Sequence, residues 1–226
     1  MIKVVFGFGV PLLWWSAWTT YIRTLQRTNQ LSKFRSYIYD VCTIVSAISA
    51  IALGLFGLAP FSASSFATSL RVLLGAIIVG VLMLAAQVVA LWVVHFLCST
   101  PGRPGQSRYP NQALWLLPIT GAAEEVLFRG CLLSALIMCG LPPGMAVCVT
   151  AALFGVIHIS QFGWYGVLLH SCTGLVFGLL ALKFGFVAAI ATHATFNLFA
   201  WVVNAWKRRL RCAALSEMKG ERHSVG

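Results

Sequence analysis

Six residues whose side chains can do chemistry lie in apolar surroundings in the second half of the chain. They are Glu124, Glu125, Arg129, His158, His193 and Asn197. The chain has only five acidic residues in all, so two adjacent glutamates among Leu, Ile, Val, Ala and Phe stand apart from its composition. A charged side chain at the centre of a membrane helix costs about 2.5–3.5 kcal/mol on insertion scales, and such residues usually mark a functional site. The glutamate pair therefore indicates a site.

The first group of these residues is the run Glu-Glu-x-x-x-Arg. Glu125 and Arg129 are four residues apart and share one face of a helix, whereas Glu124 points about 100° away. We expect Arg129 to neutralise one carboxylate while the other, Glu124, faces a cavity. A buried ion pair that only locks two helices together would explain the spacing equally well. Pro118 predicts a kink or water entry close to the pair.

Two further groups carry histidine at the same helical spacing. His158 follows Phe154 by four residues, and Asn197 follows His193 by four. Each histidine alone is better explained as an interior residue whose hydrogen bonds are made within the protein. Their coincidence with the glutamates on three of four consecutive apolar stretches favours a common site. His170 has no partner at helical spacing and is expected to be structural.

The elements that must position these groups are membrane helices. With 59% apolar and 9% charged residues, the composition is that of a membrane protein. Seven apolar stretches have the roughly 20 residues that cross a hydrocarbon core: 4–22, 37–58, 72–97, 113–138, 141–159, 162–182 and 186–206. The sequence predicts an all-α, polytopic transmembrane helical bundle of about seven spans.

The basic residues indicate the orientation of this bundle. Twelve of the sixteen Lys and Arg residues lie in the first loop, the third loop and the C-terminal tail. Cytoplasmic segments carry such an excess, so we expect the N-terminus outside and the C-terminus in the cytoplasm. The basic residues behind the net charge of +11 are therefore expected to orient the protein in the membrane, and nucleic-acid binding is not expected. Anionic lipid is the expected partner of the tail. The compact length and short loops fit a multi-pass protein of the cell membrane, in particular a bacterial inner membrane.

Polar connections divide the chain into four parts. These are an N-terminal three-span region (1–98), a cytoplasmic loop (99–112), a four-span catalytic core (113–206) and a basic cytoplasmic tail (207–226). Asp40 lies a few residues into the second span, and Lys33 or Arg35 of the neighbouring loop is its expected partner. The chemistry is therefore expected in the four-span core.

The three motifs, in this order, resemble those of the CPBP family of CAAX-processing and bacteriocin-processing intramembrane endopeptidases. That family includes the eukaryotic type II CAAX prenyl endopeptidase and bacterial Abi proteins, and the resemblance covers about 114–203. It implies an endopeptidase that hydrolyses a membrane-associated protein or peptide. By the same resemblance, Glu124 is the general base and His158 its partner in holding the attacking water. His193 and Asn197 would bind the oxyanion.

The resemblance further implies supporting roles for Glu125 and Arg129 and leaves the cofactor open. Zinc is possible, with Glu124, His158 and His193 as ligands. The sequence has no H-E-x-x-H motif, and water activation by Glu and His needs no metal. The metal-free mechanism is therefore favoured.

Two other functions compete with the endopeptidase. A non-catalytic immunity or scaffold protein could keep the same fold, although an intact motif set argues against it. A transporter or proton relay would also place Glu and His inside a bundle. Transporters of that kind commonly show a repeat between their halves, and this sequence shows none.

Overall fold

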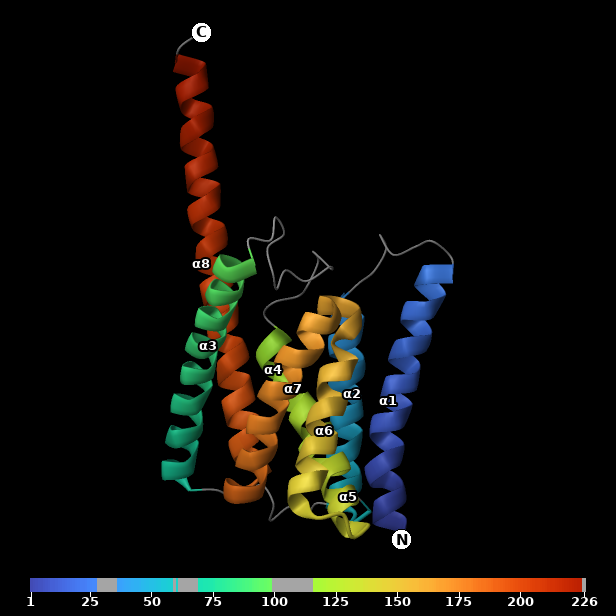
Figure 1. Ribbon diagram of the computed structural model, residues 1–226. Helices are drawn as coiled ribbons and strands as arrows, with labels where there is room; N and C mark the ends of the chain where they lie inside the picture. The colour runs from blue at the N-terminus through green and yellow to red at the C-terminus, as the bar shows by residue number, and fades with distance from the viewer. Residues whose placement is uncertain (28–35, 59, 61–68, 99–115, 225–226) are drawn as a thin grey trace.

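The computed structural model describes residues 1–27, 36–58, 60, 69–98 and 116–224. Every regular element in these ranges is helical (Figure 1). In chain order they are α1 (Ile2–Arg27), α2 (Ser36–Leu55), α3 (Leu70–Cys98), α4 (Leu117–Glu125), η4 (Val126–Leu133), α5 (Ser134–Met138), α6 (Pro143–Ile157), α7 (Ile159–Phe184) and α8 (Phe186–Ser224). The two ends of the chain lie at opposite ends of the bundle, and α8 extends well beyond the other helices (Figure 1). The all-α prediction is confirmed.

Five helical segments in the described ranges are long and apolar enough to cross a membrane. They are Ile2–Tyr21, Ile38–Leu55, Leu70–Val89, Gly163–Phe184 and Phe186–Val203. The two remaining predicted spans take a different form. The described part of 113–138 is the broken run α4–η4–α5, and 141–159 contains the 15-residue helix α6. Both shorter elements carry site residues.

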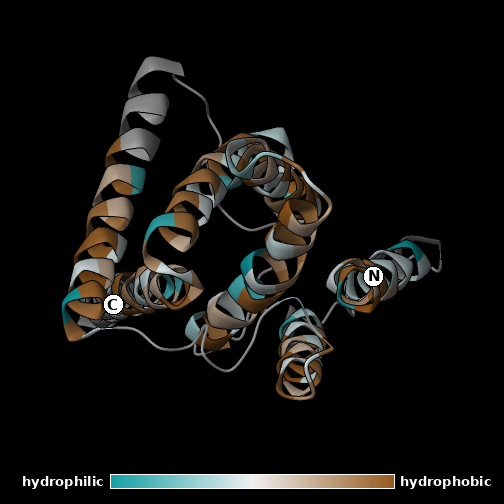
Figure 2. Cartoon of the chain, turned by 90° about the horizontal axis from the view of Figure 1, so that it is seen from below, coloured by the Kyte–Doolittle hydropathy of each residue, from teal (hydrophilic) through white to brown (hydrophobic). Residues whose placement is uncertain are grey.

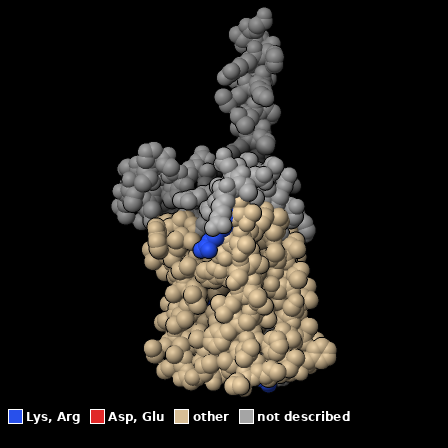
Figure 3. All heavy atoms as spheres, turned by 90° about the vertical axis from the view of Figure 1, so that its right-hand side faces the viewer, with Lys and Arg blue, Asp and Glu red and all other residues tan. Residues whose placement is uncertain are grey.

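The sides of the bundle are apolar. Hydrophobic residues predominate along the helices (Figure 2), and large apolar side chains such as Leu13, Leu82 and Trp164 are 73%, 62% and 77% exposed. On one whole side, basic atoms show only near the two ends of the described surface, and no acidic atom shows at all (Figure 3). Such a surface would be unfavourable in water and suits contact with lipid.

Tight packing of α6 against α7 fixes the position of the motif histidine His158. A Cβ atom added to Gly155 would lie 2.0 Å from Ser171 Oγ and 2.4 Å from the Val167 carbonyl, so the two backbones approach as closely as small residues allow. At Gly163 the backbone has φ 68° and ψ −162°, a conformation that favours glycine. The chain bends there, between the end of α6 and the long part of α7.

The N-terminal helices pack directly on the helices that carry the motifs. Trp14 and Trp18 of α1 and Tyr39 of α2 share one hydrophobic core with Phe128 of η4. On the other side, Thr192 of α8 donates a hydrogen bond to the Ala76 carbonyl of α3 over 3.1 Å. The region 1–98 is therefore a structural part of the site's surroundings.

The expected kink at Pro118 is not where the helix becomes irregular. Pro118 lies in the first turn of α4, where a backbone N–H has no intrahelical partner and its loss disturbs nothing. The irregular segment is the eight-residue π-helix η4, which begins directly after Glu125. Wider π turns are frequent at functional sites, and this one carries Arg129 at its fourth position.

Candidate active site

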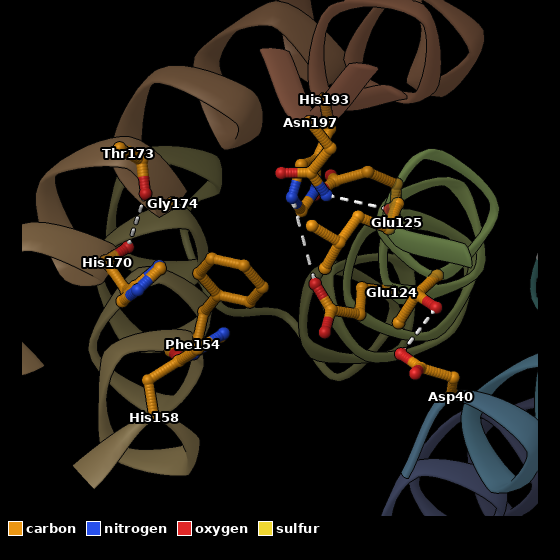
Figure 4. Close-up of polar contacts among 12 residues, drawn as sticks. Asp40, Glu124, Glu125, Phe154, His158, His170, Thr173, Gly174, His193 and Asn197 are labelled. Carbon is orange, nitrogen blue, oxygen red and sulfur yellow. Dashed lines mark hydrogen bonds and ion pairs between the residues drawn. The ribbon is translucent and has the colours of Figure 1, made fainter. Parts of the chain in front are cut away.

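The two glutamates are the last residues of α4, and both are buried, with 4% exposure for Glu124 and none for Glu125. Adjacent helical residues point about 100° apart, so the two carboxylates have different neighbours (Figure 4). The asymmetry expected from their positions is present in the structure.

Glu125 forms the buried ion pair that the four-residue spacing predicts. Arg129 Nε lies 3.1 Å from Glu125 Oε2, and neither side chain is exposed. Arg129 Nη2 also donates a hydrogen bond of 2.6 Å to the Gly174 carbonyl of α7. Its guanidinium lies 5.1 Å from the ring centre of Phe154 and 5.8 Å from that of Phe177. Arg129 thus ties η4 to α7 while it neutralises Glu125.

His193 of α8 lies between the two glutamates. Its Nδ1 is 2.9 Å from Glu125 Oε1, and its Nε2 is 3.8 Å from Glu124 Oε2. An ionised carboxylate only accepts hydrogen bonds, so the Nδ1–H of His193 donates to Glu125. The ring stacks on Phe177 with centres 4.4 Å apart. Glu125 and Phe177 thereby fix the imidazole so that Nε2 faces Glu124.

Asn197 holds α8 against the start of α4. Its Nδ2 donates a hydrogen bond of 2.9 Å to the Leu117 carbonyl. The close approach depends on Gly121, because a Cβ atom there would lie 2.5 Å from Asn197 Nδ2 and 3.0 Å from His193 Cδ2. One amide hydrogen of Asn197 thus serves helix packing, and the same amide carries a second N–H.

His158 lies at the C-terminal cap of α6, where its Nδ1–H donates to the Phe154 carbonyl over 2.8 Å. In a neutral ring this leaves the lone pair on Nε2. The ring stacks on His170 of α7, with centres 3.8 Å apart and planes 13° from parallel. His170 had no predicted partner because its partner comes from a different helix. The structure brings it to the site.

Phe154 lies between the stacked histidines and the glutamate side of the site (Figure 4). Its ring centre is 4.9 Å from that of His158 and 5.8 Å from that of His193. The Phe-x-x-x-His motif thus supplies the aromatic contact that joins α6 to α8.

The three residues named as possible zinc ligands do not come together as a set. In the described ranges, no group of three or more His, Cys, Asp or Glu side chains could hold a metal ion. His158 uses Nδ1 on its own backbone, and Phe154 contacts both motif histidines. Glu124, His158 and His193 therefore do not fit a zinc site in this arrangement.

Two residues of α2 reach the site that the sequence did not assign to it. The Tyr39 hydroxyl donates a short hydrogen bond to Glu124 Oε1. Thr120 Oγ1 donates to Asp40 Oδ1 over 2.8 Å, and Asp40 is only 2% exposed. The expected partners of Asp40, at positions 33 and 35, lie outside the described residues. The structure places this carboxyl against α4, and the only sequence signal was its position inside an apolar stretch.

A comparison with protein families supports the reading of the motifs. Residues 107–199 match the model of the Rce1-like family of type II CAAX prenyl endopeptidases. The resemblance to the CPBP family is thereby confirmed over this segment. Comparisons with curated proteins and with solved structures gave no significant match. The matched segment holds all six predicted site residues and excludes Tyr39 and Asp40.

Proposed function

We propose that this chain, whose residues 107–199 are Rce1-like, is an intramembrane endopeptidase of the CAAX type. It hydrolyses a peptide bond in a protein or peptide associated with the membrane. The observation that carries the proposal is the buried pair of Glu124 Oε2 and His193 Nε2, 3.8 Å apart. Two polar atoms at this separation are beyond direct hydrogen-bond range and can both bind one water molecule.

Glu124 is the general base in this proposal. Its carboxylate takes a proton from the water as the water oxygen attacks the carbonyl carbon of the scissile bond. When the tetrahedral intermediate collapses, the C–N bond breaks and Glu124 returns the proton to the leaving amine. General acid–base transfer of this kind contributes about 10²–10⁴-fold to rate.

Three other residues assist this step. His158 of α6 is the proposed partner of Glu124 in holding the water, through Nε2, because the Phe154 carbonyl accepts its Nδ1–H. With its Nδ1–H held by Glu125, His193 donates from Nε2 only as an imidazolium, which carries an N–H on both nitrogens. This Nε2–H and the second N–H of Asn197 are the proposed donors to the oxyanion, and each such donor is worth about 10²–10³-fold in related sites. Glu125 and Arg129 position His193 and α7 without touching the substrate. The proposed mechanism uses no metal ion, because the arrangement of Glu124, His158 and His193 does not fit one.

The topology proposal is a seven-pass membrane protein with its N-terminus outside and its C-terminus in the cytoplasm. The first and last helices end at opposite ends of the bundle (Figure 1), which supports an odd number of passes. The basic loops and tail support the orientation. The cell membrane, specifically a bacterial inner membrane, is the proposed location, with anionic lipid bound at the tail. A green fluorescent protein fused after residue 226 should fluoresce, and an alkaline phosphatase fused there should stay inactive. The opposite result would reject the orientation.

The test of the endopeptidase uses purified full-length protein in lipid vesicles. The probes are an internally quenched peptide with a farnesylated C-terminal CAAX box and the same peptide without the farnesyl group. Wild-type protein should cleave at least the farnesylated probe, and Glu124→Gln should lower kcat by at least about 100-fold. Glu217→Gln makes the same chemical change in the C-terminal part of α8, outside the matched segment 107–199, and should keep the wild-type rate. Equal rates for wild type and Glu124→Gln, or no cleavage by the wild type, would reject the proposal.

A further inference from the structure

Tyr39 is the residue outside the family-matched segment that touches the proposed base. Its hydroxyl donates to Glu124 Oε1, while Glu124 Oε2 faces His193 Nε2. The two oxygens of one carboxylate therefore have separate partners, from α2 and from α8. This division distinguishes the oxygen that is held from the oxygen that faces the second catalytic group.

The Tyr39 ring is held firmly by its neighbours. It is 7% exposed and packs edge-on against Trp18 of α1, with ring centres 4.8 Å apart. Trp14, one turn earlier on α1, lies 5.8 Å away. Two aromatic contacts on a buried ring leave the hydroxyl few alternative positions.

A hydrogen-bonded chain fixes the backbone of Tyr39 as well. Trp14 Nε1 donates to Thr43 Oγ1 over 2.9 Å, and Thr43 Oγ1 donates to the Tyr39 carbonyl over 2.7 Å. The next residue, Asp40, accepts from Thr120 of α4, one helical turn before Glu124. The turn of α2 that carries Tyr39 is thus joined to α1 on one side and to α4 on the other.

We propose that Tyr39 is a positioning residue of the active site, which holds Glu124 Oε1 so that Oε2 is the oxygen that receives the proton from water. The inference rests on the proposed endopeptidase function. It assigns the N-terminal three-span region a direct part in the site. A tyrosine hydroxyl donating to a carboxylate is a charge-assisted hydrogen bond, which is about twice as strong as a neutral one.

The test is Tyr39→Phe, which removes the hydroxyl and keeps the ring between Trp14 and Trp18. In vesicles with the farnesylated CAAX probe, we expect kcat to fall about 10- to 100-fold, since a lost hydrogen bond to a charged group has that magnitude. KM should stay unchanged because Tyr39 does not contact the substrate. Tyr165→Phe, the same change on α7, should keep wild-type kcat and KM.

A variant with 4-aminophenylalanine at position 39 separates hydrogen bonding from packing. It restores an N–H donor on the same ring, so kcat should return to within about threefold of wild type, if the donor is what matters. A kcat of Tyr39→Phe equal to wild type, or a fall in the amino variant as large as in Tyr39→Phe, would overturn the inference. If Tyr39→Phe does not accumulate in membranes, the amino variant alone carries the test, and a fall of about tenfold or more in its kcat would overturn the inference. If Glu124→Gln is inactive while Tyr39→Phe keeps wild-type activity, only the role of Tyr39 is rejected. Wild-type activity in Glu124→Gln would reject the proposed function itself.

Discussion

His193 donates through Nδ1 to Glu125 over 2.9 Å, although the two residues are 68 positions apart and come from α8 and α4. Glu125 also pairs with Arg129. One carboxylate therefore neutralises a buried guanidinium and orients a histidine at the same time. Glu124, its neighbour, neutralises no buried guanidinium. Among the described side chains, its oxygens have a hydrogen bond from Tyr39 and a polar contact with His193.

This difference predicts opposite phenotypes for the same substitution at adjacent positions. Glu125→Gln leaves the buried Arg129 charge without its partner, and breaking a buried ion pair in this way costs about 3–5 kcal/mol. We expect a clear loss of thermal stability in detergent, measured by the unfolding temperature. Glu124→Gln should instead keep a nearly native unfolding temperature and lose activity.

The double variant Glu125→Gln with Arg129→Met provides the control for this prediction. Removing the charge together with its partner avoids the unpaired buried cation, so much of the lost unfolding temperature should return. If Glu125→Gln alone unfolds at the wild-type temperature, the ion pair does not stabilise the fold and its assigned role is wrong.

A second prediction concerns the space between α4 and α8. Gly121→Ala would place a Cβ atom 2.5 Å from Asn197 Nδ2 and 3.0 Å from the His193 ring, so Asn197, His193 or the whole of α8 must shift. A displacement of about 1 Å at a catalytic group can cost about 100-fold in rate, and we expect kcat to fall by about 10- to 100-fold. Gly75→Ala is the matched control, because a Cβ atom at Gly75 of α3 meets nothing within 4 Å. Equal kcat values for the two alanine variants would contradict the tight contact.

The sequence was sufficient to predict what depends on local spacing. Hydrophobic length predicted the helices, and the four-residue interval predicted the pairing of Glu125 with Arg129. The same periodic logic says nothing about contacts between helices that are distant in sequence. The Tyr39–Glu124 and His158–His170 contacts are of that kind, so neither was predictable from a single chain.

One local prediction failed for a physical reason. Pro118 was expected to bend a helix interior, but the helix begins beside it, and the irregularity lies in the π-helix after Glu125. A π turn has no residue signature comparable to proline, and in this one Arg129 contacts the Gly174 carbonyl of α7. The length of an apolar stretch likewise could not show that 113–138 would be interrupted.

The third prediction tests the metal-free reading. Because the described residues form no three-ligand group, cleavage of the farnesylated probe should continue at the wild-type rate after treatment with EDTA or 1,10-phenanthroline. Purified protein should contain less than about 0.1 equivalents of zinc by elemental analysis. Loss of activity with chelator that zinc restores would show that the side chains rearrange into a metal site.

The fourth prediction concerns the stacked histidines. His170 lies parallel to His158, with ring centres 3.8 Å apart, so a flat ring at position 170 limits the rotation of the His158 ring. His170→Phe preserves a flat ring and should retain kcat within about threefold, whereas His170→Ala frees His158 and should lower kcat by about tenfold or more. The measurement is kcat in vesicles, with protein amounts matched and unfolding temperatures recorded for both variants. If the Phe variant is as impaired as the Ala variant, the imidazole nitrogens of His170 contribute to the reaction, and the residue does more than restrain its neighbour.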